Sequence, residues 1–113
     1  IYGTPTWHGN GPRLYLSSKG GKVYALDPAN GDTAAGWSGP ITIGQPSNPV
    51  VFNQGLYVGS SDGNLYEYAI TTGLQTGVRA IGSTVGDPVV DAYLWRIYAG
   101  AADGRIYAFT TPF

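Results

Sequence analysis

The chain has 113 residues, no cysteine and no methionine, and its six basic and seven acidic residues leave a formal net charge of −1. Without cysteine the chain has neither a disulfide framework nor thiolate chemistry. The bases form no cluster, which argues against a nucleic-acid groove. No apolar run approaches the roughly 20 residues of a membrane-spanning helix. Few charges with many Tyr, Gly, Ser and Thr residues favour an extracellular or periplasmic protein.

A repeat dominates the chain. Segments 14–26, 56–68 and 97–109 align without a gap, at offsets of 42 and 41 residues. Each copy carries two tyrosines nine residues apart: Tyr15 and Tyr24, Tyr57 and Tyr66, Tyr98 and Tyr107. A period near 40 residues with abundant strand-forming residues is typical of β-propeller blades. The register of the tyrosines predicts packing between blades rather than ligand stacking.

Each aligned segment is expected to be a β-hairpin. Val, Ile, Leu and Tyr fill its arms, and its centre is Gly20-Gly21, Asp62-Gly63 or Asp103-Gly104. These dipeptides predict a tight turn with positive φ at both central positions. Asp62 and Asp103 could instead be cation ligands, but no D-x-D spacing supplies further carboxylates. The turn interpretation is therefore favoured.

Short apolar stretches after Pro5, Pro49 and Pro88 predict the innermost strand of each blade. The outer strand is expected near residues 33–37 or slightly later in the first blade, and near 76–81 in the second. The hairpin arms are apolar on nearly consecutive residues, as in strands buried on both faces. Helical periodicity is absent.

The sequence thus predicts an all-β propeller segment of about three four-stranded antiparallel blades within a single domain, residues 1–113. The blades are expected at about 3–43, 46–82 and 86–113, the last lacking its outer strand. A closed propeller usually has four to eight blades. We therefore expect the chain not to be a stable monomer, with Ile1 and Tyr2 pairing beside the third blade. Position 1 is not Met, which predicts a processed start or a piece of a longer chain.

Two motifs carry a family resemblance: ALDPANG at 25–31 with Trp37 after it, and YVGSSDGNLY at 57–66. They resemble the PQQ-like β-propeller repeat family, which includes quinoprotein alcohol dehydrogenases and the outer-membrane assembly lipoprotein BamB. The second repeat departs from the pattern, with Ala69 in place of Asp and no Trp after it. The family's Trp docks adjacent blades, so the resemblance leaves docking after the second blade in question.

A quinone dehydrogenase of this family would imply a Ca²⁺ site, a catalytic Asp, a Trp stacked on the quinone and often a vicinal Cys pair. This chain has no Cys and no Glu-Asn-Asp group with ligand spacing. No metal, cofactor or catalytic residue is predicted. His8 is the single histidine and has no Ser, Cys or carboxylate partner nearby in sequence.

Candidate contact residues lie in loops. Those between one blade and the next are Gln45, Asn48, Ser83, Thr84 and Asp87. Asp87 precedes Pro88, where it could be a base or a metal ligand, although capping a turn is the favoured role. Tyr93 and Trp95 lie in the loop after the innermost strand of the third blade. They could contact a partner or a sugar face, or pack on the neighbouring blade.

The predicted function is a non-enzymatic β-propeller scaffold or protein-binding module, part of a larger or oligomeric propeller. Its partners would be the remainder of a longer chain or identical copies, and a protein or glycan, with no nucleic acid and no membrane span. A carbohydrate-binding propeller and a fragment of a PQQ-dependent dehydrogenase remain the alternatives.

Overall fold

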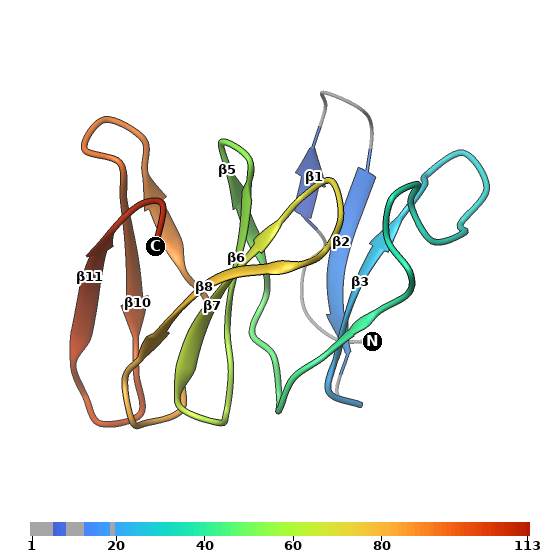
Figure 1. Cartoon of the computed structure of the whole chain (residues 1–113). Coiled ribbons are helices and arrows are strands. Elements are labelled where there is room, and N and C mark those ends of the chain that lie inside the picture. Colours follow the sequence, from blue (N-terminus) through green and yellow to red (C-terminus); the bar gives the residue numbers. More distant parts are fainter. Residues whose placement is uncertain (1–5, 9–12, 19) are drawn as a thin grey trace.

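The chain forms three antiparallel sheets that stand side by side in a computed structural model describing residues 6–8, 13–18 and 20–113 (Figure 1). The first sheet contains β1 (Thr6–His8), β2 (Arg13–Ser18), β3 (Lys22–Leu26) and β4 (Ile41–Thr42). The second contains β5 (Val50–Phe52), β6 (Gly55–Gly59), β7 (Asn64–Ala69) and β8 (Gln75–Ala80). The third contains β9 (Val89–Asp91), β10 (Arg96–Gly100) and β11 (Ile106–Thr110). The all-β propeller segment predicted from the sequence is confirmed.

Strands in each sheet are ordered as they occur in the chain, so each sheet is an up-and-down blade. The first strands lie together, because β5 contacts both β1 and β9. Figure 1 shows the β5–β6 and β9–β10 turns at one end of the sheets, which we call the upper end. The β6–β7 and β10–β11 hairpin turns lie at the opposite, lower end.

The core occupies the two seams between neighbouring sheets. Leu56 and Val58 of β6 face the first sheet, whereas Tyr57 between them faces the third, and none of the three is more than 2% exposed. In β11, by contrast, exposed residues alternate with half-buried ones. The expectation that hairpin arms are buried on both faces therefore holds for β6 and is wrong for β11, whose outer face has no neighbouring sheet in the described chain.

The outer strand of the first sheet lies later than residues 33–37. Thr33 forms a single bridge with Leu26, and the strand β4 begins at Ile41. The intervening segment instead buries Ala34 and Trp37 in the first seam. The outer strand expected near 76–81 is β8, which agrees with the prediction.

The hairpin turns differ from the predicted type. Ser60 N donates to Asn64 O (3.0 Å) and Gly63 N donates to Ser60 O (3.3 Å), which encloses a three-residue loop. Gly63 has a φ of +93°, while Asp62 has no positive φ. This pattern is typical of a type I turn followed by a left-handed glycine. The prediction of positive φ at both central positions was wrong, because the loop is one residue longer than a two-residue turn.

The turn aspartates serve the hairpins, as favoured from the sequence. Asp62 Oδ1 accepts a hydrogen bond from Asn64 N (3.0 Å), and Oδ2 accepts one from the Tyr66 hydroxyl (2.5 Å). Asp103 accepts the same pair of bonds, from Arg105 N (2.9 Å) and the Tyr107 hydroxyl (2.5 Å). The second tyrosine of these repeats thus stabilises its own turn. Tyr66 also packs against the core of the first seam, as the sequence predicted.

Three glycine substitutions test the turn geometry. Gly63→Ala should destabilise by about 1–2 kcal/mol, because its left-handed φ strains an L residue and a Cβ would lie 3.3 Å from Gly82. Gly104→Ala, with the same strain but open space, should cost less. Gly20→Ala should be nearly neutral, because that φ is not in the left-handed region. Chemical denaturation of the three variants gives the order, and equal midpoints would contradict the turn assignment.

Hydrogen exchange tests the position of β6. Every residue of this strand is buried, and both of its faces lie in a seam. Its amides should therefore exchange most slowly, because their exposure requires the largest opening of the structure. Residues of β10, which have a neighbouring sheet on one face, are the internal control. Equal protection of β6 and β10 would contradict this arrangement.

Candidate functional site: a pocket at the second seam

The first seam is closed by side chains of the first sheet. Trp37 lies 6.0 Å from the Tyr15 ring, and its Nε1 donates to the Ile70 carbonyl (2.9 Å). The same carbonyl accepts bonds from Arg13 Nη1 (2.8 Å) and the Tyr15 hydroxyl (3.3 Å). Arg13 Nη2 also donates to the Ala35 carbonyl (2.7 Å). An indole and a guanidinium thus join the first sheet to the second.

The second seam is built from the equivalent residues of the next repeat, 41 or 42 positions later, and several of these differ in kind. Gly55 replaces Arg13, Glu67 replaces Ala25, and Arg79 replaces Trp37. A Cβ on Gly55 would lie 2.8 Å from the Tyr57 ring, so this position has no room for a side chain as Tyr57 is placed. The second seam therefore has no guanidinium at the position of Arg13 and no indole at the position of Trp37.

Phe113 packs where the second repeat lacks a tryptophan. Its ring lies 5.2 Å from Tyr57, edge to face, and 5.9 Å from Phe109. Arg79 lies over the same ring at 5.0 Å. The docking that the sequence left in question after the second blade is thus made by a phenylalanine that follows the third sheet.

Glu67 is a buried carboxylate in this seam, with 3% of its surface exposed. It accepts hydrogen bonds from the Tyr57 hydroxyl (2.6 Å), Thr76 Oγ1 (2.6 Å) and Phe113 N (2.9 Å). Burial by itself raises the pKa of Glu67, but these three bonds and the nearby Arg79 together hold it below its usual value. Burial and the bond to Glu67 raise the pKa of the Tyr57 hydroxyl. The seam therefore holds a carboxylate in its ionised form.

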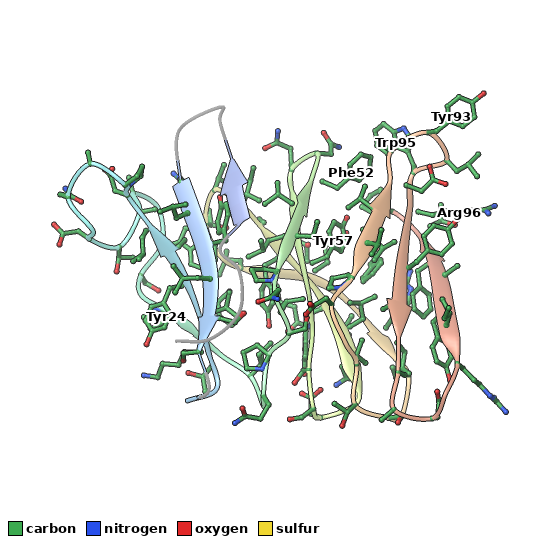
Figure 2. All side chains as sticks on the ribbon, turned by 180° about the vertical axis from the view of Figure 1, so that it is seen from behind. Tyr24, Phe52, Tyr57, Tyr93, Trp95 and Arg96 are labelled. Atoms are coloured by element: carbon green, nitrogen blue, oxygen red, sulfur yellow. The ribbon has the colours of Figure 1, made fainter. Side chains whose placement is uncertain are left out.

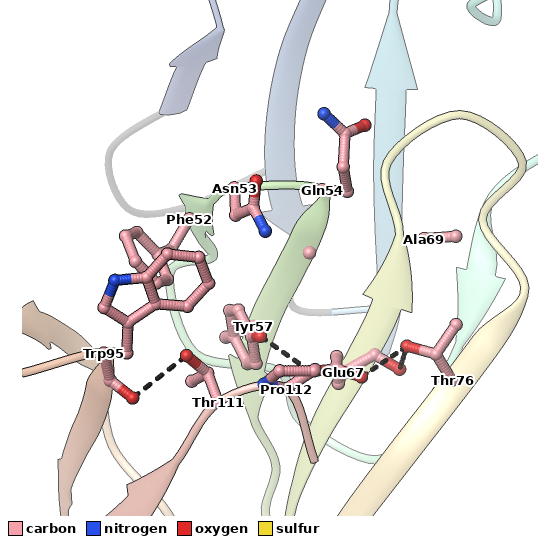
Figure 3. A pocket seen from close by; sticks show the side chains of 11 residues that line it. Phe52, Asn53, Gln54, Tyr57, Glu67, Ala69, Thr76, Trp95, Thr111 and Pro112 are labelled. Atoms are coloured by element: carbon pink, nitrogen blue, oxygen red, sulfur yellow. Dashed lines mark hydrogen bonds between the residues drawn. The ribbon is translucent and has the colours of Figure 1, made fainter. Parts of the chain in front are cut away.

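A pocket of about 270 Å³ opens above this carboxylate, between the second and third sheets (Figure 3). Its lining combines aromatic rings, short polar side chains and one charged group: Phe52, Asn53, Gln54, Gly55, Tyr57, Glu67, Ala69, Thr76, Trp95, Thr111 and Pro112. Figure 3 shows Tyr57 and Glu67 at the floor and the Phe52 and Trp95 rings at one wall. The pocket is thus an aromatic hollow with a single negative charge at its base.

Trp95 holds an unusual backbone conformation on the pocket wall. Its φ is +56°, a region that bulky residues rarely adopt. Its carbonyl accepts bonds from Thr111 N (2.8 Å) and Thr111 Oγ1 (3.0 Å). Its ring meets Phe52 edge to face at 5.3 Å. Trp95 therefore packs on the neighbouring blade, as the sequence allowed, yet remains 47% exposed.

The predicted contact residues separate into two groups. Tyr93 and Trp95 lie at the upper end, where Figure 2 shows Tyr93 projecting outward and Trp95 beside Phe52. The remaining residues belong to the connections near the lower hairpin turns: Gln45, Asn48, Ser83, Thr84 and Asp87. Gln45 O, for example, accepts from Ser61 N (3.0 Å) in the β6–β7 turn. A single site cannot contain both groups, and the structure joins only Tyr93 and Trp95 to the pocket end.

Asp87 links two blades. Its carboxylate accepts hydrogen bonds from Asn48 N (2.8 Å) and Asn48 Nδ2 (3.1 Å). Both oxygens are thus used to tie the connection before β9 to the connection before β5. Such a carboxylate fits a structural role better than that of a base or a metal ligand.

Sequence reasoning missed the floor of the pocket. Glu67 is the single glutamate in the chain, and it stands where the other two repeats have Ala25 and Ala108. Gly55 likewise stands where they have Arg13 and Arg96. Aligning the three repeats position by position would have pointed to both residues. A charged residue at an alanine position and a glycine at an arginine position are exchanges that packing alone does not favour.

The donor set of a Ca²⁺–quinone site does not fit the described residues. No three His, Cys, Asp or Glu side chains gather there as a metal ion would require. The side chain of His8 lies outside the described part of the molecule. Among the described residues, the structure contains no helix that could span a membrane.

Comparison with known proteins finds a similarity in sequence to one curated protein. No protein-family model matches the chain. It is 38% identical over 72 residues to the outer membrane protein assembly factor BamB of Taylorella asinigenitalis (strain MCE3), a match that spans 63% of this chain and 18% of that protein. The chain is therefore much shorter than this relative.

Two solved structures show the same architecture. BamB from Moraxella catarrhalis superposes with a TM-score of 0.76 at 21% identity, over 96% of this chain and 34% of that one. The computationally designed Ika4 protein superposes with a TM-score of 0.76 at 17% identity, over 94% and 63%. The chain is thus similar to BamB in sequence over 72 residues and similar to BamB and Ika4 in fold.

Glu67→Gln tests the ionised seam carboxylate. Because the pKa of folded Glu67 lies below the ordinary value of 4.5, its contribution to stability is present above that pH and is lost as the pH falls through the lower, folded value. Thermal melting should show Glu67→Gln destabilised by about 1–2 kcal/mol at pH 7, with the difference from wild type shrinking towards pH 3. Asp32→Asn removes a carboxylate from an exposed loop and serves as the control for the loss of one negative charge. A pH-independent difference would contradict the assignment.

Proposed function

We propose that this chain is a non-enzymatic β-propeller segment that binds another protein through the upper end of its second and third sheets. The observation that carries this proposal is the exposed β9–β10 turn beside the seam pocket. Tyr93 is 92% exposed, Leu94 48% and Trp95 47%. Aromatic side chains grouped at a hollow are typical of the centre of a protein interface.

The backbone of the turn supports a binding role. Asp91 Oδ1 accepts bonds from Tyr93 N (3.1 Å) and Leu94 N (3.2 Å), which fix the backbone of the turn while both side chains remain exposed. The positive φ of Trp95 costs of order 1–3 kcal/mol, and such strain concentrates at functional sites. A rigid turn also loses little conformational freedom on binding, which favours affinity.

The setting we propose is the bacterial envelope. The relative from Taylorella is by name a factor of outer membrane protein assembly, and the low charge of this chain suits a periplasmic or extracellular location. We propose a contact within outer membrane protein assembly as its role. Tyr93 and Trp95 also favour a second candidate, a sugar ring stacked on the turn, because aromatic faces bind apolar sugar faces.

The outer edge of the third sheet is a further proposed contact. Ile106 lies on β11, the outer strand of this sheet, and is 79% exposed. An unpaired strand with apolar side chains is open to strand addition. Further polypeptide of a longer propeller, or a second copy of this chain, would cover this edge.

Tyr93→Ser tests the interface without disturbing the fold, because Tyr93 is almost fully exposed. Surface plasmon resonance with the immobilised chain, and an outer membrane protein assembly complex depleted of BamB as analyte, should show binding that Tyr93→Ser weakens at least about tenfold, as for an interface hot spot. Tyr107→Phe, at the lower end, should bind as wild type.

Two outcomes would reject the proposal: no binding by the wild-type chain, or equal loss in the two variants. A glycan array distinguishes the sugar candidate from the protein partner. If the wild-type chain binds no protein but binds a sugar that Tyr93→Ser does not bind, the ligand of this surface is the sugar.

A further inference from the structure

We propose that the seam pocket binds an arginine side chain presented by a protein partner, with the guanidinium seated over Glu67 between Tyr57 and Trp95. The inference rests on the proposed protein-binding function and names the chemical group that this surface would recognise. The inference comes from a comparison of the two seams, because the first seam holds an arginine of this same chain at the position equivalent to the pocket.

In the first seam the guanidinium of Arg13 fills the corresponding position. It donates to the carbonyls of Ile70 and Ala35, beside Tyr15. In the second seam Gly55 stands in place of Arg13, and Gly55 lines the pocket. Thr111, the residue 41 positions after Ile70, lines it too. The pocket therefore lies where the preceding repeat places an arginine.

The second seam adds a charge that the first lacks. Glu67 stands at the position of Ala25 and is the one charged residue among those that line the pocket. Thr76, which replaces Ala34, donates to Glu67 Oε1 at 2.6 Å and orients it. A buried carboxylate binds a guanidinium more strongly than a surface one would, because water screens the pair less. The negative charge of Glu67 thus favours a positively charged ligand in the pocket.

Arg79 does not occupy this position. Its guanidinium carbon lies 5.0 Å from the Phe113 ring centroid, and its Nη1 donates to the Val78 carbonyl (3.2 Å). It approaches Glu67 closely enough to help keep the carboxylate ionised, but it does not line the pocket. The cation over Glu67 has to come from outside this part of the chain.

The walls and the size of the pocket favour the guanidinium of a single arginine side chain over other cations. The rings of Phe52 and Trp95 form an aromatic wall, on which a planar guanidinium stacks better than an ammonium does. At about 270 Å³ the hollow is smaller than most pockets for drug-sized ligands, which begin near 300 Å³, and so suits a single long side chain. The exposed Tyr93 and Leu94 beside it would contact the polypeptide that carries this arginine.

A pair of peptides tests the proposal on the full chain. Acetyl-Gly-Arg-Gly-amide and its neutral citrulline isostere differ only in the charged group. NMR titration, observed at the Gly55 amide and the Trp95 indole N–H, should show the arginine peptide binding about tenfold tighter, a preference expected of a charge-assisted hydrogen bond. Equal affinity of the two peptides, or shifts at the lower hairpin turns instead, would overturn the inference.

Variants locate the binding. Glu67→Gln should abolish the preference for arginine over citrulline. In case that variant folds poorly, Ala69→Leu narrows the pocket without altering Glu67 and should weaken the arginine peptide several-fold, whereas Ala80→Leu, at an exposed position of β8, should not. An unchanged preference in Glu67→Gln, or equal effects of the two leucine variants, would reject the site.

The two proposals fail separately. If the chain binds the assembly complex through Tyr93 but does not distinguish the peptides, the arginine site is wrong and the protein-binding function stands. If the peptides are distinguished but no protein binds, the proposed function is wrong and the pocket remains a guanidinium site.

Discussion

The middle sheet depends on a neighbour against each of its faces. Leu56 and Val58 point one way from β6 and Tyr57 points the other, and all are essentially inaccessible to water. Full burial of a side chain of this size contributes about 1.5–3 kcal/mol, so loss of either seam would remove much of the stability of the sheet. The polar groups of the seams therefore have to be paired within the protein, as the Ile70 carbonyl and the Glu67 carboxylate are.

The two seams meet this requirement by different chemistry. In the first, Trp37 and Arg13 bond to the Ile70 carbonyl of the second blade. In the second, Phe113 supplies an aromatic ring but Gly55 supplies no side chain, and a carboxylate stands where an alanine would pack. A repeat protein can thus gain a binding site at one seam through a few substitutions while the other seam keeps the fold stable.

Much of the fold could be predicted from the sequence because local rules determine it. The period of the repeat, the prolines before the first strands and the glycines of the hairpins all act over a few residues. The type of hairpin turn was predicted wrongly, since it depends on whether Ser60 or Ser61 pairs with Asn64. That difference of one residue is not revealed by the dipeptide Asp62-Gly63. The late position of β4 likewise follows from the burial of Trp37, a tertiary contact.

The site was harder to predict because its parts come from three separate stretches. Tyr93 and Trp95 were recognisable as exposed aromatics, but Glu67 looked like an ordinary strand residue, and its link to Phe113 spans 46 positions. The loop residues chosen with them lie at the other end of the sheets, where Asp87 and Asn48 bond to each other. The position of a loop relative to the pocket depends on how the strands are arranged in space, and the sequence alone does not reveal that arrangement.

Glu67 is hard to explain as a packing residue. A carboxylate taken out of water is costly, and three hydrogen bonds with a nearby arginine offset that cost without making the seam better than an apolar one. Ala25 at the same position of the first seam shows that this fold packs well without a charge there. The strained φ of Trp95 is a second local cost on the wall of the same pocket. Both residues also join the second and third sheets, through the bond of Phe113 N to Glu67 and the contact of Trp95 with Phe52. Apolar residues could make such a junction without either local cost, so the meeting of the two costs at one hollow points to selection for binding as well as for stability.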